Sequence, residues 1–222
     1  MNATTQSRTS AHARARLLAV VLWAVLLATT WIFDQQLWRL FLGADPHDRA
    51  ALEAIQRRDW WTFLRGFGYL PFWVLVAVAG ESARRGPGRI LASGWPFVRV
   101  LLSAALAGAG AELVKLVLAR ERPGLTGEHV YRELFSGFAR SGNLGFASSH
   151  AAVAFGAAFA LLRICPRLGW VALLGAVGCG YTRLVVGAHF TSDVVGGALL
   201  GYAFAQMCAR SVRATPRDCE FR

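Results

Sequence analysis

Long apolar runs that carry almost no charge constrain this chain more than any other feature. They occupy residues 17–33, 66–80, 100–111, 141–162, 168–182 and 194–209 of a 222-residue sequence in which 55% of the residues are hydrophobic. Most approach the ~17 to 25 residues that a helix needs to cross a bilayer, and each can extend by a turn past its flanking charges. Because so many of them lack the polar stripe of a soluble helix, the sequence predicts an all-α, polytopic membrane protein with six transmembrane helices.

The first run has a second interpretation as a cleaved signal peptide, because Arg8, Arg14 and Arg16 precede it. Its apolar stretch is longer than the ~7 to 15 residues usual in a signal peptide. Bulky Trp31 and Phe33 stand where small residues would mark a cleavage site. We therefore predict that this run is a membrane anchor.

The distribution of arginine predicts the orientation of the helices. Alternate connections are rich in arginine, and the positive-inside rule places these connections and both termini in the cytoplasm. The connections over residues 34–65, 120–147 and 184–193 then face outward. The Arg-rich connections contain Arg8, Arg14 and Arg16; Arg84, Arg85 and Arg89; Arg163 and Arg167; and Arg210, Arg213 and Arg217.

The overall composition bears on partners and location. The net charge is +11, but the basic residues lie between the apolar runs and not on one amphipathic face, so the predicted partner is the lipid bilayer and no nucleic acid is expected. An Arg-rich, Lys-poor and Ala-rich sequence is typical of bacteria with GC-rich genomes. We expect the bacterial inner membrane, with the outward connections on the periplasmic face.

The remaining segments add little chemistry of their own. Residues 48–66 are predicted to form one amphipathic interfacial helix that ends in Trp60 and Trp61, whose rings suit the headgroup layer. The four cysteines lack metal-ligand spacing, so neither a zinc site nor a disulfide framework is expected. We predict a single membrane domain over residues 1–210 and a polar cytoplasmic tail over residues 211–222.

The first polar cluster is KLVLARERP, residues 115–123, at the outer end of the third run. Lys115 is the only lysine in the chain, and it lies about two helical turns before Arg122. Both side chains point the same way if the helix continues to Pro123, and such a pair suits an anion with several oxygens. Snorkelling to lipid headgroups accounts for Arg120 between them, while Glu112 can neutralise Lys115.

The second cluster is GFASSHAAVAF, residues 145–155, where small polar residues directly precede an apolar helix. Ser148 is a predicted N-cap, and the backbone N–H groups of Ser149 and His150 then form an anion site at the positive end of the helix dipole. His150 can protonate a leaving oxygen near neutral pH. Its alternative role is that of a capping or interfacial histidine.

The third cluster is YTRLVVGAHFTSDVVGG, residues 181–197, which joins the last two runs. His189 and Asp193 are four residues apart, a spacing that lets the carboxylate hold one imidazole nitrogen while the other attacks. Arg183 adds a planar cation. Ser192 or Asp193 can also cap the last helix, which is compatible with catalysis.

All three clusters fall on the predicted outer face. The clusters supply cations, a helix start, a histidine that can act as a general acid, and a His–Asp pair. This combination predicts a phosphoryl-transfer pocket that needs no metal or other cofactor.

These residues resemble the signature of the type-2 phosphatidic acid phosphatase family, a resemblance that covers roughly residues 66–207. The signature consists of Lys, six residues and Arg-Pro; then Pro-Ser-Gly-His; then Ser-Arg, five residues, His, three residues and Asp. The chain departs from it at Ala147, Ser149 and Thr182, which stand where Pro, Gly and Ser are usual. The matching positions are Lys115, Arg122 and Pro123; Ser148 and His150; and Arg183, His189 and Asp193.

The resemblance implies a role for each residue. His189 would be the nucleophile that forms a phosphohistidine, with Asp193 orienting it and His150 protonating the leaving group. The phosphoryl oxygens would be held by Lys115, Arg122, Ser148, the Ser149 backbone N–H and Arg183.

The implied activity is metal-independent hydrolysis of a lipid phosphate of the phosphatidate, phosphatidylglycerol phosphate, polyprenyl diphosphate or lipid A type. Two alternatives remain: transfer of the phosphoryl group to another lipid, and an inactive membrane scaffold. The sequence makes no prediction of oligomeric state.

Overall fold

The computed structural model describes residues 3–85 and 96–209, and side chains within these ranges except at residues 3–13, 84, 85 and 209. The predicted all-α class is confirmed: the described residues form α-helices and one short 3-10 helix, with isolated bridges but no strand. The elements are α1 (Ala3–Ile32), α2 (Asp34–Phe41), α3 (Arg49–Gln56), α4 (Asp59–Gly66), α5 (Leu70–Arg85), α6 (Pro96–Leu118), η1 (Ser136–Phe138), α7 (Ser149–Ile164), α8 (Pro166–Val185) and α9 (Thr191–Ala209).

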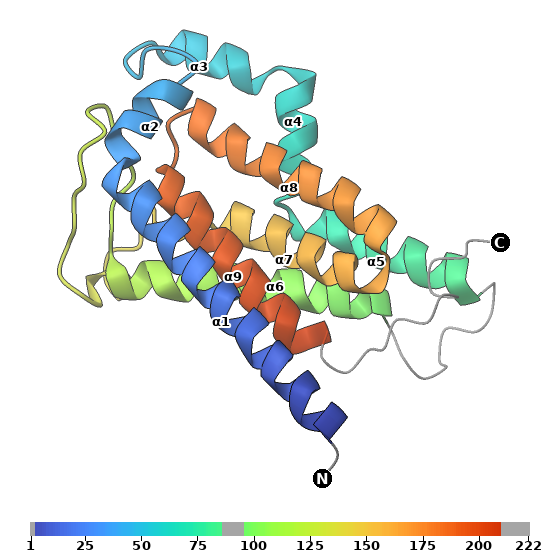
Figure 1. The fold of residues 1–222 in the computed structure, drawn as a ribbon. Helices are drawn as coiled ribbons and strands as arrows, with labels where there is room; N and C mark the ends of the chain where they lie inside the picture. The colour runs from blue at the N-terminus through green and yellow to red at the C-terminus, as the bar shows by residue number, and fades with distance from the viewer. Residues whose placement is uncertain (1–2, 86–95, 210–222) are drawn as a thin grey trace.

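Helix α7 is the centre of the bundle. It packs against α6, α8 and α9 (Figure 1). Half of its residues are buried alanine, glycine or leucine. Small residues let membrane helices approach until their backbones touch. A Cβ atom on Gly197 of α9 would lie 2.4 Å from the carbonyl oxygen of Ser148, and one on Gly201 would lie 2.6 Å from the nitrogen of Gly156. The start of α7 is therefore fixed against the start of α9.

The N-terminal helix lies across the outer side of α9 (Figure 1). Trp23 packs edge-on against Phe159 and beside Tyr202, with ring centroids 6.3 and 5.7 Å away. The chain then breaks at Phe33, and α2 begins with Asp34, whose side chain is completely buried. This break brings a carboxylate from the N-terminal helices to the bundle end that carries the predicted site.

The prediction of one interfacial helix over residues 48–66 is wrong, because this segment forms two helices, α3 and α4. Asp48 caps α3 by accepting a 2.9 Å bond from Ala51 N, but Arg58 is extended and separates α3 from α4. Trp60 is exposed, as expected for a headgroup contact. Trp61 instead points inward, where its Nε1 donates to the carbonyl oxygen of Thr182 at 3.2 Å. A buried tryptophan thus ties α4 to α8.

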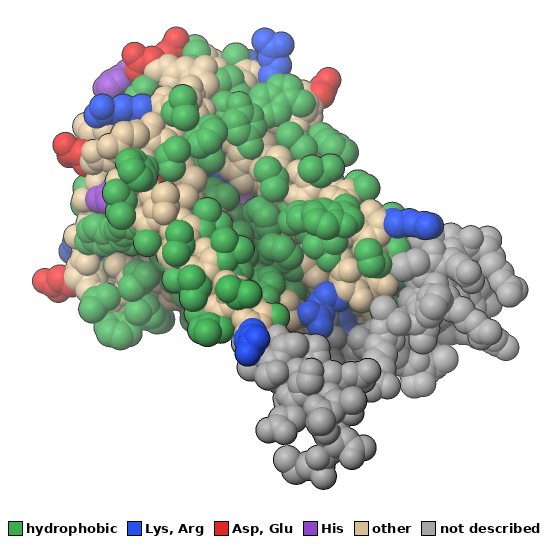
Figure 2. All heavy atoms as spheres, in the orientation of Figure 1, with side chains coloured by type: hydrophobic (Ala, Val, Ile, Leu, Met, Phe, Trp, Pro, Cys, Tyr) green, Lys and Arg blue, Asp and Glu red, His purple; other side chains and the backbone are tan. Residues whose placement is uncertain are grey.

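The described helices include several that are long enough to cross a membrane. Arg14–Ile32, Pro96–Leu118 and Pro166–Val185 qualify, and α4 with α5 forms a further apolar pair bent by 66°. Figure 2 shows a broad apolar band on the visible face, with acidic side chains gathered at one end. The polytopic membrane class is confirmed, while the count of six spans stays a prediction. The predicted roles of Arg89 and of residues 211–222 lie outside the described residues.

Candidate active site

The three polar clusters meet at one end of the bundle, around a cavity of about 290 Å³. Its lining residues come from the ends of α6 and α8, the start of α7 and the connections 119–148 and 186–190. These segments lie at the same end of the bundle (Figure 1). Six of the eight predicted site residues line the cavity, and Ser148 and Asp193 are buried. The lining residues are Glu112, Lys115, Leu116, Arg122, Ser141, Asn143, Leu144, Ser149, His150, Arg183 and His189.

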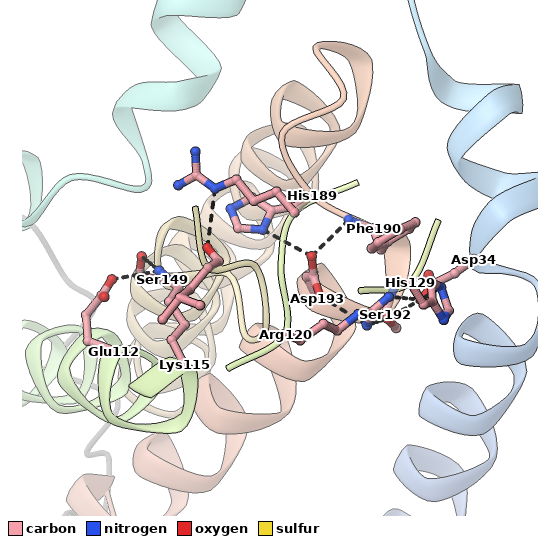
Figure 3. Close-up of polar contacts among 12 residues, drawn as sticks. Asp34, Glu112, Lys115, Arg120, His129, Ser149, His189, Phe190, Ser192 and Asp193 are labelled. Carbon is pink, nitrogen blue, oxygen red and sulfur yellow. Dashed lines mark hydrogen bonds and ion pairs between the residues drawn. The ribbon is translucent and has the colours of Figure 1, made fainter. Parts of the chain in front are cut away.

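His189 and Asp193 form the predicted pair. The imidazole Nδ1 lies 3.2 Å from Oδ2 of Asp193, and the same oxygen accepts a 2.9 Å bond from the Phe190 N–H (Figure 3). His189 is 2% exposed and Asp193 is fully buried. Burial lowers the pKa of His189 to about 4, against the opposing pull of Asp193. At neutral pH the imidazole is therefore uncharged and keeps a lone pair on the ring nitrogen that Asp193 does not hold.

Lys115 and Arg122 converge on the cavity, but not by the predicted route. Helix α6 ends at Leu118, because Ala119 turns into the left-handed region with φ 49° and the chain leaves the helix. Arg122 reaches the cavity from an extended segment, where its N–H donates to Asn143 and its Nε to Leu144. The shared direction of the two cations therefore comes from the fold of the connection and not from helical periodicity.

Lys115 is held in a fixed position inside the bundle. Its Nζ donates to Glu112 at 2.8 Å and to Ser149 Oγ at 3.0 Å (Figure 3). The lysine side chain is 9% exposed, whereas that of Glu112 is 57% exposed. The predicted neutralisation of Lys115 by Glu112 is thus present, and Lys115 also connects α6 to the first turn of α7.

Arg183 lies in the last turn of α8 and is 7% exposed. Its Nε is buried and has no hydrogen-bond partner within the described part of the chain. A buried guanidinium with a free donor that faces a cavity is suited to a bound anion. With Lys115 and Arg122 it outnumbers the one lining carboxylate, Glu112, so the cavity has a net positive charge.

The start of α7 supplies further donors. Ser148 occupies the predicted N-cap position, but the predicted capping bond is absent: its buried Oγ contacts no partner among the described residues. The Ser148 N–H instead donates to the carbonyl oxygen of Asp193 at 2.9 Å. The helix start is thereby joined to the His189–Asp193 pair, and the Ser148 hydroxyl is left available.

His150 lies in the first turn of α7, between the cavity and Tyr69. The Tyr69 ring meets the imidazole edge-on at a centroid distance of 5.0 Å. His150 Nε2 is buried and finds no hydrogen-bond partner in the described ranges. His150 thus lines the cavity with a ring nitrogen that suits a proton transfer, and its role as the acid stays a prediction.

The interpretation of Arg120 as a snorkelling residue is wrong. Arg120 is completely buried and forms ion pairs with Asp34 at 2.8 Å and with Asp193 at 3.3 Å. Sequence reasoning also missed Asp34. One signal was present in the sequence: Asp34 is the first charged residue after the first apolar run.

The residues around the cavity suit an anion better than a metal. No group of three or more His, Cys, Asp or Glu side chains in the described chain is arranged to hold a metal ion. The cavity offers cationic and N–H donors instead, and Asp193 already contacts His189 and Arg120. The chemistry that this arrangement supports is attack of an uncharged imidazole on a phosphoryl group held by cations.

Comparison with known proteins relates the chain to phosphatases. Residues 96–217, more than half of the 222 in the chain, match the family model described as the PAP2 superfamily. The chain is 32% identical over 131 residues to a lipid A 1-phosphatase of Rhizobium johnstonii, an alignment that covers 56% of this chain and 51% of that protein. It is 42% identical over 65 residues to a lipid A 4'-phosphatase of Bacteroides thetaiotaomicron, with 28% of each chain covered. The chain thus spans about half the length, or less, of these curated relatives.

A solved structure shows the same fold. The crystal structure of a transmembrane PAP2-type phosphatidylglycerolphosphate phosphatase from Bacillus subtilis superposes with a TM-score of 0.53 at 20% sequence identity. The similarity covers 86% of this chain and 92% of that one. It therefore includes helices before residue 96, where the match to the family model begins.

Proposed function

Because the chain belongs to the PAP2 superfamily, we propose that it hydrolyses a phosphate ester on a membrane lipid through a phosphohistidine. The observation that carries this proposal is the single cavity that collects both histidines and three cations, with the carboxylate of Asp193 directly behind His189. Cations and histidines without a carboxylate behind one imidazole would bind phosphate, but they would not provide an oriented nucleophile.

The proposed reaction has two steps. The ring nitrogen of His189 that faces away from Asp193 attacks phosphorus, and the bond to the lipid oxygen breaks as His150 donates a proton to that oxygen. His150 then takes a proton from water, which attacks phosphorus and releases phosphate and His189. Lys115, Arg122, Arg183, Ser148 and the Ser149 N–H hold the phosphoryl oxygens, on which negative charge is concentrated in both steps.

The proposed substrate class is a lipid A-type glycolipid phosphate, because two of the relatives are lipid A phosphatases. Purified protein would be assayed against lipid A, phosphatidate, phosphatidylglycerol phosphate and undecaprenyl diphosphate. We expect phosphate release to be fastest from lipid A. Faster release from a glycerophospholipid would reject the substrate class but keep the reaction, whereas release that depends on an added acceptor lipid would favour phosphotransfer. No turnover of any lipid would favour an inactive scaffold.

Hydrolysis is expected to survive chelation and to be blocked by vanadate. The phosphoryl group is proposed to be bound by cationic side chains and backbone N–H groups, and vanadate resembles the transition state that they stabilise. Phosphate release would be measured with excess EDTA, with added Mg²⁺ and with vanadate. Loss of activity in EDTA that Mg²⁺ restores would contradict the metal-free mechanism.

The active site is proposed to face the periplasm, with the connection between α7 and α8 in the cytoplasm. Single cysteines at Thr126 and Pro166 would be introduced into a cysteine-free variant in a bacterial inner membrane. In intact cells, we expect an impermeant thiol reagent to label position 126 and not position 166. The reverse pattern would place the active site in the cytoplasm, and lysed cells provide the control that both positions react.

A further inference from the structure

The strongest unassigned feature is a buried charge network behind the His189–Asp193 pair. Arg120 lies between two carboxylates, with its Nη2 2.8 Å from Oδ2 of Asp34 and its Nη1 3.3 Å from Oδ1 of Asp193 (Figure 3). The contact with Asp193 has an ion-pair distance without hydrogen-bond geometry. All three side chains are completely buried. The oxygen of Asp193 that does not face His189 is thus occupied by a guanidinium.

Ser192 links the same groups a second time. Its backbone N–H donates to Oδ1 of Asp34 at 2.8 Å, and its hydroxyl contacts Oδ2 of Asp34. The hydroxyl also accepts a 2.7 Å bond from Arg120. Asp34 therefore holds the backbone of the residue that directly precedes Asp193.

Aromatic rings close the network against water. The Arg120 guanidinium carbon lies 4.4 Å from the ring centroids of both Trp31 and Phe190. His129 lies at the outer edge, where its Nε2 is 3.6 Å from Asp34 and its ring packs on Phe190. In surroundings of low dielectric constant, a cation shared by two carboxylates has a strong influence on where each of them points.

We infer that Asp34 and Arg120 are positioning residues, which orient Asp193 toward His189 although neither lines the phosphate cavity. This inference rests on the proposed function. With Asp34 present, Arg120 divides its attraction between two carboxylates, and Oδ2 of Asp193 stays on His189. Without the charge of Asp34, Asp193 is the one anionic partner that Arg120 keeps among the described residues, so the carboxylate is drawn away from the imidazole.

The first test is Asp34→Asn, assayed for phosphate release from the best lipid substrate and from an aryl phosphate. Partners that orient metal ligands typically contribute ~10- to 100-fold to affinity or activity, and by analogy we expect a loss of that size in kcat. The KM is expected to stay within ~2-fold, because the phosphate-binding cations are untouched. Asp45→Asn is the matched control, since the Asp45 side chain is 69% exposed, and it should leave kcat and KM unchanged.

A double-mutant cycle with Asp193→Asn separates positioning from a general structural role. If Asp34 acts through Asp193, adding Asp34→Asn to Asp193→Asn should reduce kcat by less than ~2-fold further, since coupled residues are not additive. An equal loss in both backgrounds would overturn the inference, and so would a rise in KM without a fall in kcat.

Ser192→Ala provides an independent route that keeps every charge in the core. It removes the hydroxyl that joins Arg120 to Asp34 and should lower kcat less than Asp34→Asn does. As for Asp34→Asn, the loss should appear in the wild-type background and not in the Asp193→Asn background. If Asp34→Asn does not fold, this second cycle decides the question, and a wild-type kcat for Ser192→Ala would overturn the inference. Failure of the proposed function can be told apart from failure of this inference. The wild-type protein itself would then release no phosphate, and both proposals would be rejected.

Discussion

His189→Ala is expected to abolish phosphate release and to form no phosphoenzyme, whereas His150→Ala should form the phosphoenzyme and then stop. The difference follows from position. His189 Nδ1 lies 3.2 Å from Asp193, while His150 lies at the start of α7 and its Nε2 has no hydrogen-bond partner in the described part of the chain. A lipid alkoxide needs a proton in order to leave, but a phenolate of low pKa scarcely does. On an activated aryl phosphate, His150→Ala therefore loses its second step and keeps its first.

The measurement is a rapid-quench assay that follows phenolate and acid-labile phosphate on the protein. His150→Ala should give a burst of phenolate and an accumulated phosphohistidine, and Asp193→Asn should form the phosphohistidine slowly. His47→Ala is the control, because the side chain of His47 is 70% exposed and belongs to the α2–α3 connection. A phosphoenzyme in His189→Ala but not in His150→Ala would invert the assignment. If label is trapped in none of the variants, direct attack by water becomes the better mechanism.

Replacement of Arg122 or Arg183 by alanine is expected to lower kcat/KM by at least ~10²-fold, as happens when one transition-state donor is removed. Arg183 has the larger expected effect, because its guanidinium is almost completely buried and its Nε has no partner within the described residues. Arg183→Lys should have a kcat/KM almost as low as that of Arg183→Ala, since lysine supplies charge but not a planar pair of donors.

Arg57→Ala is the matched control for these variants. The Arg57 side chain is 80% exposed and pairs with Glu53 on the surface, so its loss should leave kcat/KM unchanged. Initial rates over a range of lipid concentration in mixed micelles would separate kcat from KM. A loss below ~10-fold for both Arg122→Ala and Arg183→Ala would contradict the proposal that these cations stabilise the transition state.

Much of the fold could be predicted because apolar runs report directly on helices that face lipid. Each of the six runs lies wholly or largely within described helices, the longest exception being residues 141–148, which precede α7. The breaks were harder to predict. The sequence around Arg57 and Arg58 contains no Pro or Gly, so no helix-breaking residue predicted the break between α3 and α4.

The site was predictable where its residues lie close together in the sequence. His189 and Asp193 share one short segment, and their spacing alone indicated their contact. The partners of Arg120 could not be predicted in this way, because Asp34 and Ser192 lie 86 and 72 residues away from it. Local patterns instead favoured an exposed arginine beside Arg122. The left-handed turn at Ala119, which ends α6 at Leu118, directly precedes Arg120, whose side chain is buried.

The contact between α7 and α9 limits how a protein of this shape can diverge. Gly197 and Gly201 meet backbone atoms of α7, so no smaller residue exists that would bring these helices closer, and any larger one pushes them apart. The starts of these two helices carry His150 and Asp193, so their separation cannot be tuned by small steps in side-chain size. The connection between α6 and α7 is under no such limit, because side chains such as Leu134 and Phe138 are exposed there. Substitutions in this connection therefore leave the spacing between the starts of α7 and α9 unchanged.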